Sequence, residues 1–186
     1  TGWNVNQFDM TYLVNRIERL FGEKEVRRLS PWGIFSRIEK MMFGRAQTQV
    51  KISGIAIIDY LDLYKKFTYV NRESYSLDFI AHVELGERKL DHSEFEQMHL
   101  FYKLDYQKYI DYNIKDVELV DKLEDKLKLM ELLVTIAYQS KVNFEDVFSP
   151  VKIWDTVAFD ELKKTKTVVP NKSRNEKSES FEGAYV

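Results

Sequence analysis

The chain has 186 residues, of which 44% are hydrophobic and 14% aromatic, enough for one domain with a hydrophobic core and an appendage. Cysteine is absent, which excludes disulfides, thiolate zinc sites and cysteine nucleophiles, and no apolar run of 18 residues predicts a membrane span. The formal net charge of −2 does not indicate nucleic-acid binding, although residues 1–66 carry 11 basic and 7 acidic side chains.

The first predicted element is an amphipathic helix that follows Asp9. Its apolar residues recur at three- and four-residue spacing as far as Phe21, and Gly22 is a typical end signal. Residues 35–43 and 46–52 then predict the two strands of a β-hairpin.

The next segment, 54–59, is a short and nearly continuous apolar run, which predicts a strand buried on both faces. Residues 60–67 and 74–84 predict two short helices. Residues 86–99 are polar and predict a loop.

A long helix, broken at most once, is predicted from about residue 102 to 138, because apolar spacing persists there without Pro or Gly. Pro150 opens a last helix, in which we expect Trp154 and Phe159 to be core residues. Residues 171–180 contain no apolar side chain and predict a linker.

One candidate site residue is Asp9, which lies where a predicted strand gives way to a helix. An aspartate at a helix start commonly accepts hydrogen bonds from free backbone N–H groups, and that structural role is the main alternative to a function.

A second candidate is the pair Tyr112 and Asp116, whose four-residue spacing places both side chains on one face of a helix. The alternative is an ordinary solvated face, because charged residues surround the pair. Each candidate alone is a weak signal.

Together the two candidates resemble the Exo II motif (N-x-x-x-F-D, residues 4–9) and the Exo III motif (Y-x-x-x-D, residues 112–116) of DnaQ-like 3′→5′ exonucleases in family B DNA polymerases. The chain further resembles the polymerases of T-even-like bacteriophages in segments that occur in the family order. These segments are TGWN (1–4), DYLDLYKKF (59–67), SYSL (74–77), YNIKDV (112–117), FSPVKIWD (148–155) and GAYV (183–186).

The resemblance implies two-metal-ion hydrolysis of phosphodiesters by Mg²⁺ or Mn²⁺, which prefer carboxylate oxygens. It makes Asp9 and Asp116 metal ligands and directs the Tyr112 hydroxyl at the attacking water or the scissile phosphate. Asn4 and Phe8 would line the cleft beside the primer 3′ end.

The family site needs four carboxylates, and two come from the D-x-E of an Exo I motif on an earlier strand. The sole D-x-E of this chain is Asp116-Val117-Glu118, which the third motif already uses. We therefore expect an incomplete metal site, and negligible exonuclease activity of the chain alone. The sequence at both ends predicts an excised fragment.

The resemblance also implies that the hairpin helps to part the primer from the template. Met42 and Phe43 would contact bases and Arg45 a phosphate. An ordinary charged hairpin is the equally weighted alternative.

The expected fold is α/β and ribonuclease H-like, lacking its first strands, with a hairpin insertion and a helical C-terminal extension. Residues 1–129 would complete the exonuclease domain, 130–170 would return to the polymerase's N-terminal domain, and 171–186 would lead into the palm. Expected partners are single-stranded DNA, the remaining polymerase regions (Exo I strand, palm and fingers) and the sliding clamp, in the cytoplasm of a host cell. An unpaired sheet edge predicts self-association.

Two rival functions remain open at this point. The first is a non-catalytic DNA-binding or assembly module of a split or diverged polymerase. The second is a free-standing DnaQ-like nuclease, against which the family-like segment from 148 to 186 argues.

Overall fold

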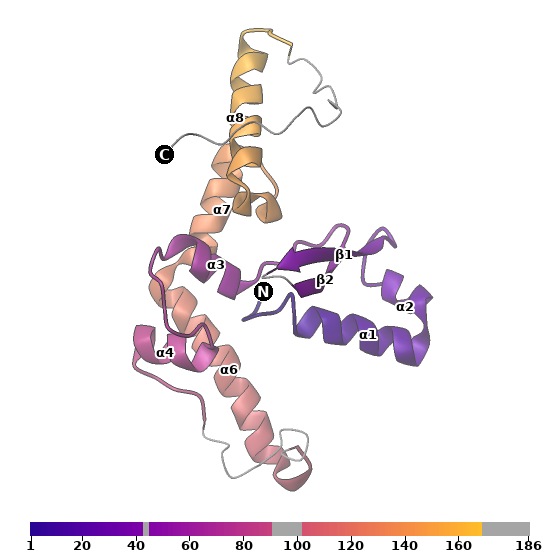
Figure 1. Ribbon diagram of the computed structural model, residues 1–186, viewed down its shortest axis with the longest axis vertical. Coiled ribbons are helices and arrows are strands. Elements are labelled where there is room, and N and C mark those ends of the chain that lie inside the picture. Colours follow the sequence, from indigo (N-terminus) through magenta and orange to yellow (C-terminus); the bar gives the residue numbers. More distant parts are fainter. Residues whose placement is uncertain (43–44, 91–101, 169–186) are drawn as a thin grey trace.

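The computed structural model describes residues 1–42, 45–90 and 102–168, and of residues 39–42 and 45–48 it describes the backbone alone. Its helices and strands are α1 (Asp9–Phe21), α2 (Glu23–Arg27), β1 (Phe35–Met42), β2 (Arg45–Ile52), α3 (Tyr60–Phe67), α4 (Leu77–Leu85), α6 (Tyr106–Leu127), α7 (Leu129–Ser140), η1 (Phe144–Phe148) and α8 (Pro150–Lys164). Helices α6, α7 and α8 follow one another along the long axis, and the hairpin with α1 and α2 projects to one side (Figure 1).

The projecting part is built on a small core between α1, α2 and the hairpin. Strands β1 and β2 pair in antiparallel register from Phe35↔Ile52 to Met42↔Arg45, which confirms the predicted hairpin. Helix α1 also forms as predicted and ends at Gly22, whose φ of 88° suits glycine. The buried residues of this hairpin core are Val14, Val26, Val50 and Ile52.

A larger helical core fills the space between α3, α4, α6, α7 and η1. Helix α4 packs against α6, and α3 packs against α7. Both α3 and α4 are capped by the side chain of the preceding residue, because Asp59 accepts a hydrogen bond from the Leu61 N–H and Ser76 from the Phe79 N–H. The largest fully buried side chains of this core are Tyr60, Tyr64, Leu63, Ile80, Leu119, Leu123, Leu133 and Val147.

The two cores are joined through the segment before α3. The Asp59 carboxylate accepts hydrogen bonds from the backbone N–H groups of Asn4 (2.8 Å) and Asn6 (3.1 Å), and the Tyr60 N–H donates to the Gly2 carbonyl (2.8 Å). The Glu145 carboxylate of η1 accepts from the Ile57 N–H (3.3 Å). These bonds fix the segment before α1 to the start of α3.

The prediction of a strand over 54–59, buried on both faces, is wrong. Within the described residues this segment makes one isolated parallel bridge, Gly2↔Asp59, and the only ladder is the two-stranded hairpin. Ile55 is 45% exposed, because no strand lies beside it in this part of the chain. The described residues therefore form a mostly helical fold with one small antiparallel sheet. The predicted mixed sheet is not seen among them.

The predicted long helix forms as two helices. Lys128, with φ 53°, ends α6 in the left-handed conformation, and α7 begins at the next residue. Glu124 fixes this joint, because its carboxylate accepts hydrogen bonds from the Met130 N–H (3.0 Å) and the Tyr60 hydroxyl (3.0 Å). Helix α4 begins at Leu77, three residues after the predicted start, because Ser76 caps it.

Helix α8 begins at Pro150 as predicted, but it buries no residue. Trp154 is 70% and Phe159 58% exposed, so their assignment to the core is wrong: α8 contacts α7 and η1 through its other face. The predicted linker 171–180 and most of the predicted loop 86–99 lie outside the described residues. Among the described helices none combines the length and the apolar character needed to cross a membrane.

Candidate active site

Helix α6 presents Tyr112 and Asp116 on one face, as the four-residue spacing predicts. The helix begins after Asp105, whose side chain accepts a hydrogen bond from the Lys108 N–H. The Tyr112 side chain is buried and the Asp116 side chain is 27% exposed. The face that carries them therefore points toward the protein rather than toward solvent, which contradicts the alternative of a solvated face.

The residue that contacts both of them is Lys89, which the sequence reasoning missed. Its Nζ lies 2.6 Å from Asp116 Oδ2 and 3.2 Å from the Tyr112 hydroxyl oxygen, and 5.2 Å from the centroid of the Tyr112 ring. Burial opposes the charge of the ammonium, but the hydrogen bonds to Asp116 and Tyr112 outweigh it, and the pKa of Lys89 is raised.

Two carboxylates, Asp78 in the first turn of α4 and Glu87 just after its end, hold the segment that carries Lys89. Asp78 accepts a hydrogen bond from the Lys89 backbone N–H (2.9 Å) and pairs with Arg88 (3.2 Å). Glu87 bridges two lysines of α6, Lys115 and Lys122, each at 2.6 Å. The segment after α4 is thus bound to α4 through Asp78 and to α6 through Glu87.

The second carboxylate oxygen of Asp116, Oδ1, is buried and has no hydrogen-bond partner among the described residues. Buried polar atoms nearly always have a partner, and a carboxylate oxygen accepts from donors or binds cations. Residues 1–42, 45–90 and 102–168 contain no cluster of three or more His, Cys, Asp or Glu side chains that could hold a metal ion. Asp116 thus fits the role of a single ligand in a site that needs further carboxylates.

Asp9 is the first residue of α1, and its side chain is exposed. The helix N-cap is Phe8, and no side chain caps the helix, so Asp9 does not have the capping role that was the alternative to a function. No other described residue forms a hydrogen bond or ion pair with its carboxylate. Phe8 is 69% exposed beside it.

Asn4 is half-buried at the turn that leads into α1, in the left-handed conformation with φ 61°. Its backbone N–H is held by Asp59, a buried carboxylate whose pKa is raised by burial against the opposing effect of the backbone donors. Asp59 therefore fixes the backbone at Asn4 and Asn6, in the turn that leads into α1. The sequence carried a signal for this structural role, because Asp59 directly precedes a predicted helix, where an aspartate typically caps the helix N-terminus.

The structure brings Tyr112 and Asp116 together through Lys89, whereas Asp9 is an exposed residue at the start of α1, the helix that packs on the hairpin core. Within the described residues, no hydrogen bond or ion pair links Asp9 to Tyr112 or Asp116. Of the hairpin residues, Met42 and Arg45 pair at the ends of β1 and β2. The side chains of Met42 and Arg45, and the whole of Phe43, lie outside the part of the chain that the structure describes.

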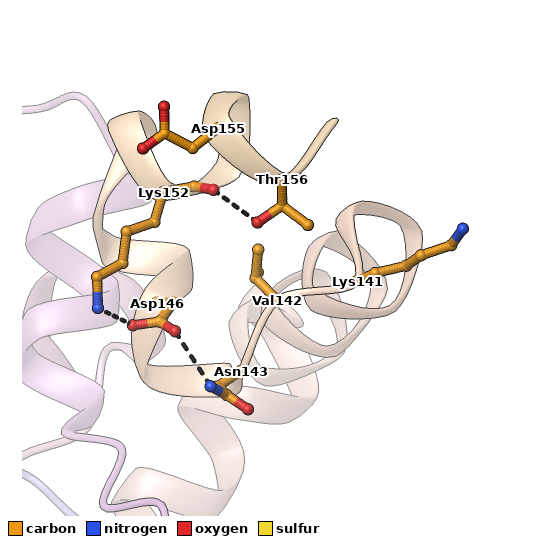
Figure 2. A pocket seen from close by; sticks show the side chains of 7 residues that line it. All are labelled: Lys141, Val142, Asn143, Asp146, Lys152, Asp155 and Thr156. Atoms are coloured by element: carbon orange, nitrogen blue, oxygen red, sulfur yellow. Dashed lines mark hydrogen bonds and ion pairs between the residues drawn. The ribbon is translucent and has the colours of Figure 1, made fainter. Parts of the chain in front are cut away.

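Two hollows lie elsewhere, and none of the predicted catalytic residues lines them. One, of about 250 Å³, lies where α7, η1 and α8 meet (Figure 2). Asp146 binds Lys152 and accepts from Asn143 there, while Lys141 points away. The other, of about 330 Å³, lies between the hairpin base and η1 and includes Asn6, Asp59 and Glu145. The ion pairs in their walls, Lys152 with Asp146 and Lys51 with Glu145, join η1 to α8 and to β2. We therefore assign these residues a structural role and place the candidate chemistry at Asp116.

The chain resembles known proteins along its whole length. Residues 1–80 match the model of the family B DNA polymerase exonuclease domain. The DNA-directed DNA polymerases of Escherichia phage RB69 and Enterobacteria phage T4 are each 37% identical to it over 187 aligned residues, which cover 100% of the chain and 20% of either relative. The chain belongs to the family B DNA polymerases.

A more distant DNA polymerase aligns over most of the same region. DNA polymerase II of Escherichia coli is 26% identical over 176 residues, 91% of the chain and 22% of that protein. The family B match over 1–80 contains Asn4, Phe8 and Asp9, and the longer alignments include Tyr112 and Asp116. The chain spans about a fifth of the length of the curated relatives it matches.

Proposed function

We propose that this chain is the proofreading part of a replicative DNA polymerase and removes mispaired nucleotides from the primer 3′ end by two-metal-ion hydrolysis. The observation that carries the proposal is the buried Oδ1 of Asp116, without a partner among the described residues, beside Tyr112 and Lys89 in a family B sequence. The fold of the complete domain would be ribonuclease H-like.

Each residue has a distinct role in this proposal. Bound Mg²⁺ or Mn²⁺ would activate the attacking water and stabilise the leaving oxygen. Asp116 and Asp9 would be carboxylate ligands, and Tyr112 would orient the water or the scissile phosphate. The Lys89 ammonium would place positive charge beside the phosphate. Asn4 and Phe8 would line the cleft, and Met42, Phe43 and Arg45 would contact DNA at the hairpin.

The remaining expectations follow from this function. Residues 1–129 would form the exonuclease part, 130–170 would return to the N-terminal domain, and 171–186 would lead into the palm. A further strand with a D-x-E would supply the other two carboxylates. The partners would be single-stranded DNA, the palm and fingers, and the sliding clamp, in the cytoplasm of the host cell.

The decisive experiment compares digestion of a 5′-labelled primer with a mispaired 3′ end by a polymerase that contains this chain and by its variants. We expect Asp9→Ala and Asp116→Ala each to slow 3′→5′ digestion by at least about 100-fold, since second-shell changes alone cost up to that factor. Asp121→Ala, an exposed aspartate on the same helix, is the matched control. Unchanged digestion in Asp9→Ala or Asp116→Ala would leave the non-catalytic module as the better assignment.

The purified 186-residue chain tests the incomplete site separately. With Mg²⁺ or Mn²⁺ we expect no measurable digestion of single-stranded DNA, because the chain supplies only half of the carboxylates. Robust digestion by the chain alone would show that its own residues complete the site.

A further inference from the structure

Helix α1 turns a row of large side chains toward solvent. Val14 is fully buried on the opposite side, whereas Phe8 is 69%, Tyr12 62% and Leu20 54% exposed. Leu13 (42%) and Phe21 (69%) are exposed as well, so the helix and its cap expose five large side chains that do not pack in the core. We call the residues Phe8, Tyr12, Leu13, Arg16, Arg19 and Leu20 the outer face of α1.

The outer face begins beside Asp9 and continues along the helix. Tyr12, Arg16 and Arg19 follow Asp9 at intervals of three and four residues, so they lie on one side of α1. At 1.5 Å per residue, the twelve positions from 8 to 19 extend about 17 Å. A strand bound along this face would therefore approach the candidate metal ligand at one end.

The charges on this face differ from those nearby. Arg16 and Arg19 are exposed and form no ion pair with a described carboxylate. By contrast, Arg27, Arg28 and Arg37 pair with Glu23, Glu25 and Glu18. Exposed aromatic rings next to unneutralised arginines suit a polyanion that carries flat bases, because bases stack on the rings and phosphates pair with the cations.

We propose that the outer face of α1 binds single-stranded DNA, with a base stacked on Tyr12 and backbone phosphates at Arg16 and Arg19. This deepens the proposed function, on which the direction of the strand toward Asp9 rests. The combination of rings and free cations favours a nucleic acid over an apolar protein surface, which would leave two arginines unpaired when buried.

The test is the binding of a fluorescein-labelled oligothymidylate to this chain, followed by fluorescence anisotropy in EDTA at several salt concentrations. We expect Tyr12→Ser to weaken binding by about 5- to 150-fold, the range for loss of one stacked base. We expect Arg16→Gln combined with Arg19→Gln to reduce the slope of log K against log salt by about 1.4, since each phosphate contact to a single strand contributes about 0.7.

Two matched controls separate this face from exposed residues in general. Tyr138→Ser removes an 86% exposed tyrosine on α7, and Arg27→Gln with Arg28→Gln removes two paired arginines; both should bind like the parent chain. Circular dichroism checks that each variant is folded. Absence of saturable binding by the parent chain, or equal effects of Tyr12→Ser and Tyr138→Ser, would overturn the inference.

The binding test and the digestion test can fail independently. Binding is measured in EDTA, without divalent metal, whereas the proposed hydrolysis needs metal. Binding that depends on Tyr12 supports the outer face even if Asp9→Ala and Asp116→Ala leave digestion unchanged. If Asp9→Ala and Asp116→Ala abolish digestion but the Tyr12 and arginine variants bind DNA like the parent chain, the nuclease proposal is supported. The proposal that the outer face of α1 binds DNA is then wrong.

Discussion

Lys89 Nζ lies 2.6 Å from Asp116 Oδ2, although 27 positions separate the two residues in the sequence. One oxygen of the carboxylate is thus paired with a cation of the chain, and the other is buried without a partner among the described residues. Both side chains are largely shielded, at 23% and 27% exposed. The pair attaches the segment after α4 to the helix that carries the candidate site.

The first prediction concerns Lys89→Met, which keeps most of the side-chain volume and removes the ammonium. The shielded Asp116 carboxylate would lose its charged partner, so we expect the free energy of unfolding at pH 7 to fall by about 1–3 kcal/mol in urea titrations. The double variant Lys89→Met/Asp116→Asn should regain part of the loss, because no charge is then left unpaired. A single variant as stable as the parent would show that the pair contributes nothing.

The second prediction concerns Asp59, which binds three backbone N–H groups and joins the two cores. Asp59→Ala removes the cap of α3 and leaves the Asn4 and Asn6 N–H groups without their acceptor, so we expect a loss of at least about 2 kcal/mol. Asp59→Asn keeps one acceptor oxygen and should lose less. Equal stability of the alanine and asparagine variants in urea titrations would be inconsistent with this account.

The third prediction is a pH dependence that depends on Glu87. Hydrogen bonds from Lys115 and Lys122 lower the pKa of this carboxyl to about 2. Since the folded-state pKa lies below the unfolded one, the stabilisation is fully present above the unfolded value near 4.3 and is lost as the pH falls toward 2.

Thermal unfolding of the parent and of Glu87→Gln therefore should differ most at pH 6 and converge between pH 4.5 and about 2, the lowered pKa. Glu73→Gln, at an exposed glutamate without an ion pair in the described part of the chain, is the control and should track the parent at every pH. A difference between parent and Glu87→Gln that stays constant down to pH 2 would show that another interaction carries it.

The sequence predicted those elements whose limits depend on neighbouring residues. Helix α1 ends at Gly22, α8 begins at Pro150 and the hairpin follows its alternating pattern, because turn and cap chemistry acts within a few residues. Tyr112 and Asp116 were found in the same way, since helical spacing alone places them together.

The failures involve contacts that local patterns do not record. An apolar run such as 54–59 becomes a strand only where another strand lies beside it, and the described residues provide one bridge. Trp154 has the helical spacing of a core residue, yet it is exposed, because spacing does not say whether a partner covers the face. Lys89 was missed because its partner is a long-range one, and whether Asp9 shares a site with Asp116 stays a prediction.

The ion pair between Glu18 of α1 and Arg37 of β1 has a mechanical consequence. Arg37 lies two residues into an eight-residue strand, so its contact at 2.5 Å clamps the hairpin near the base. The stem from Phe35 to Met42 extends about 24 Å at 3.4 Å per residue, and a rotation of about 5° at the base would displace its far end by about 2 Å. Because both side chains of this pair are exposed to solvent, salt would screen it, and we expect the orientation of the hairpin to vary with ionic strength.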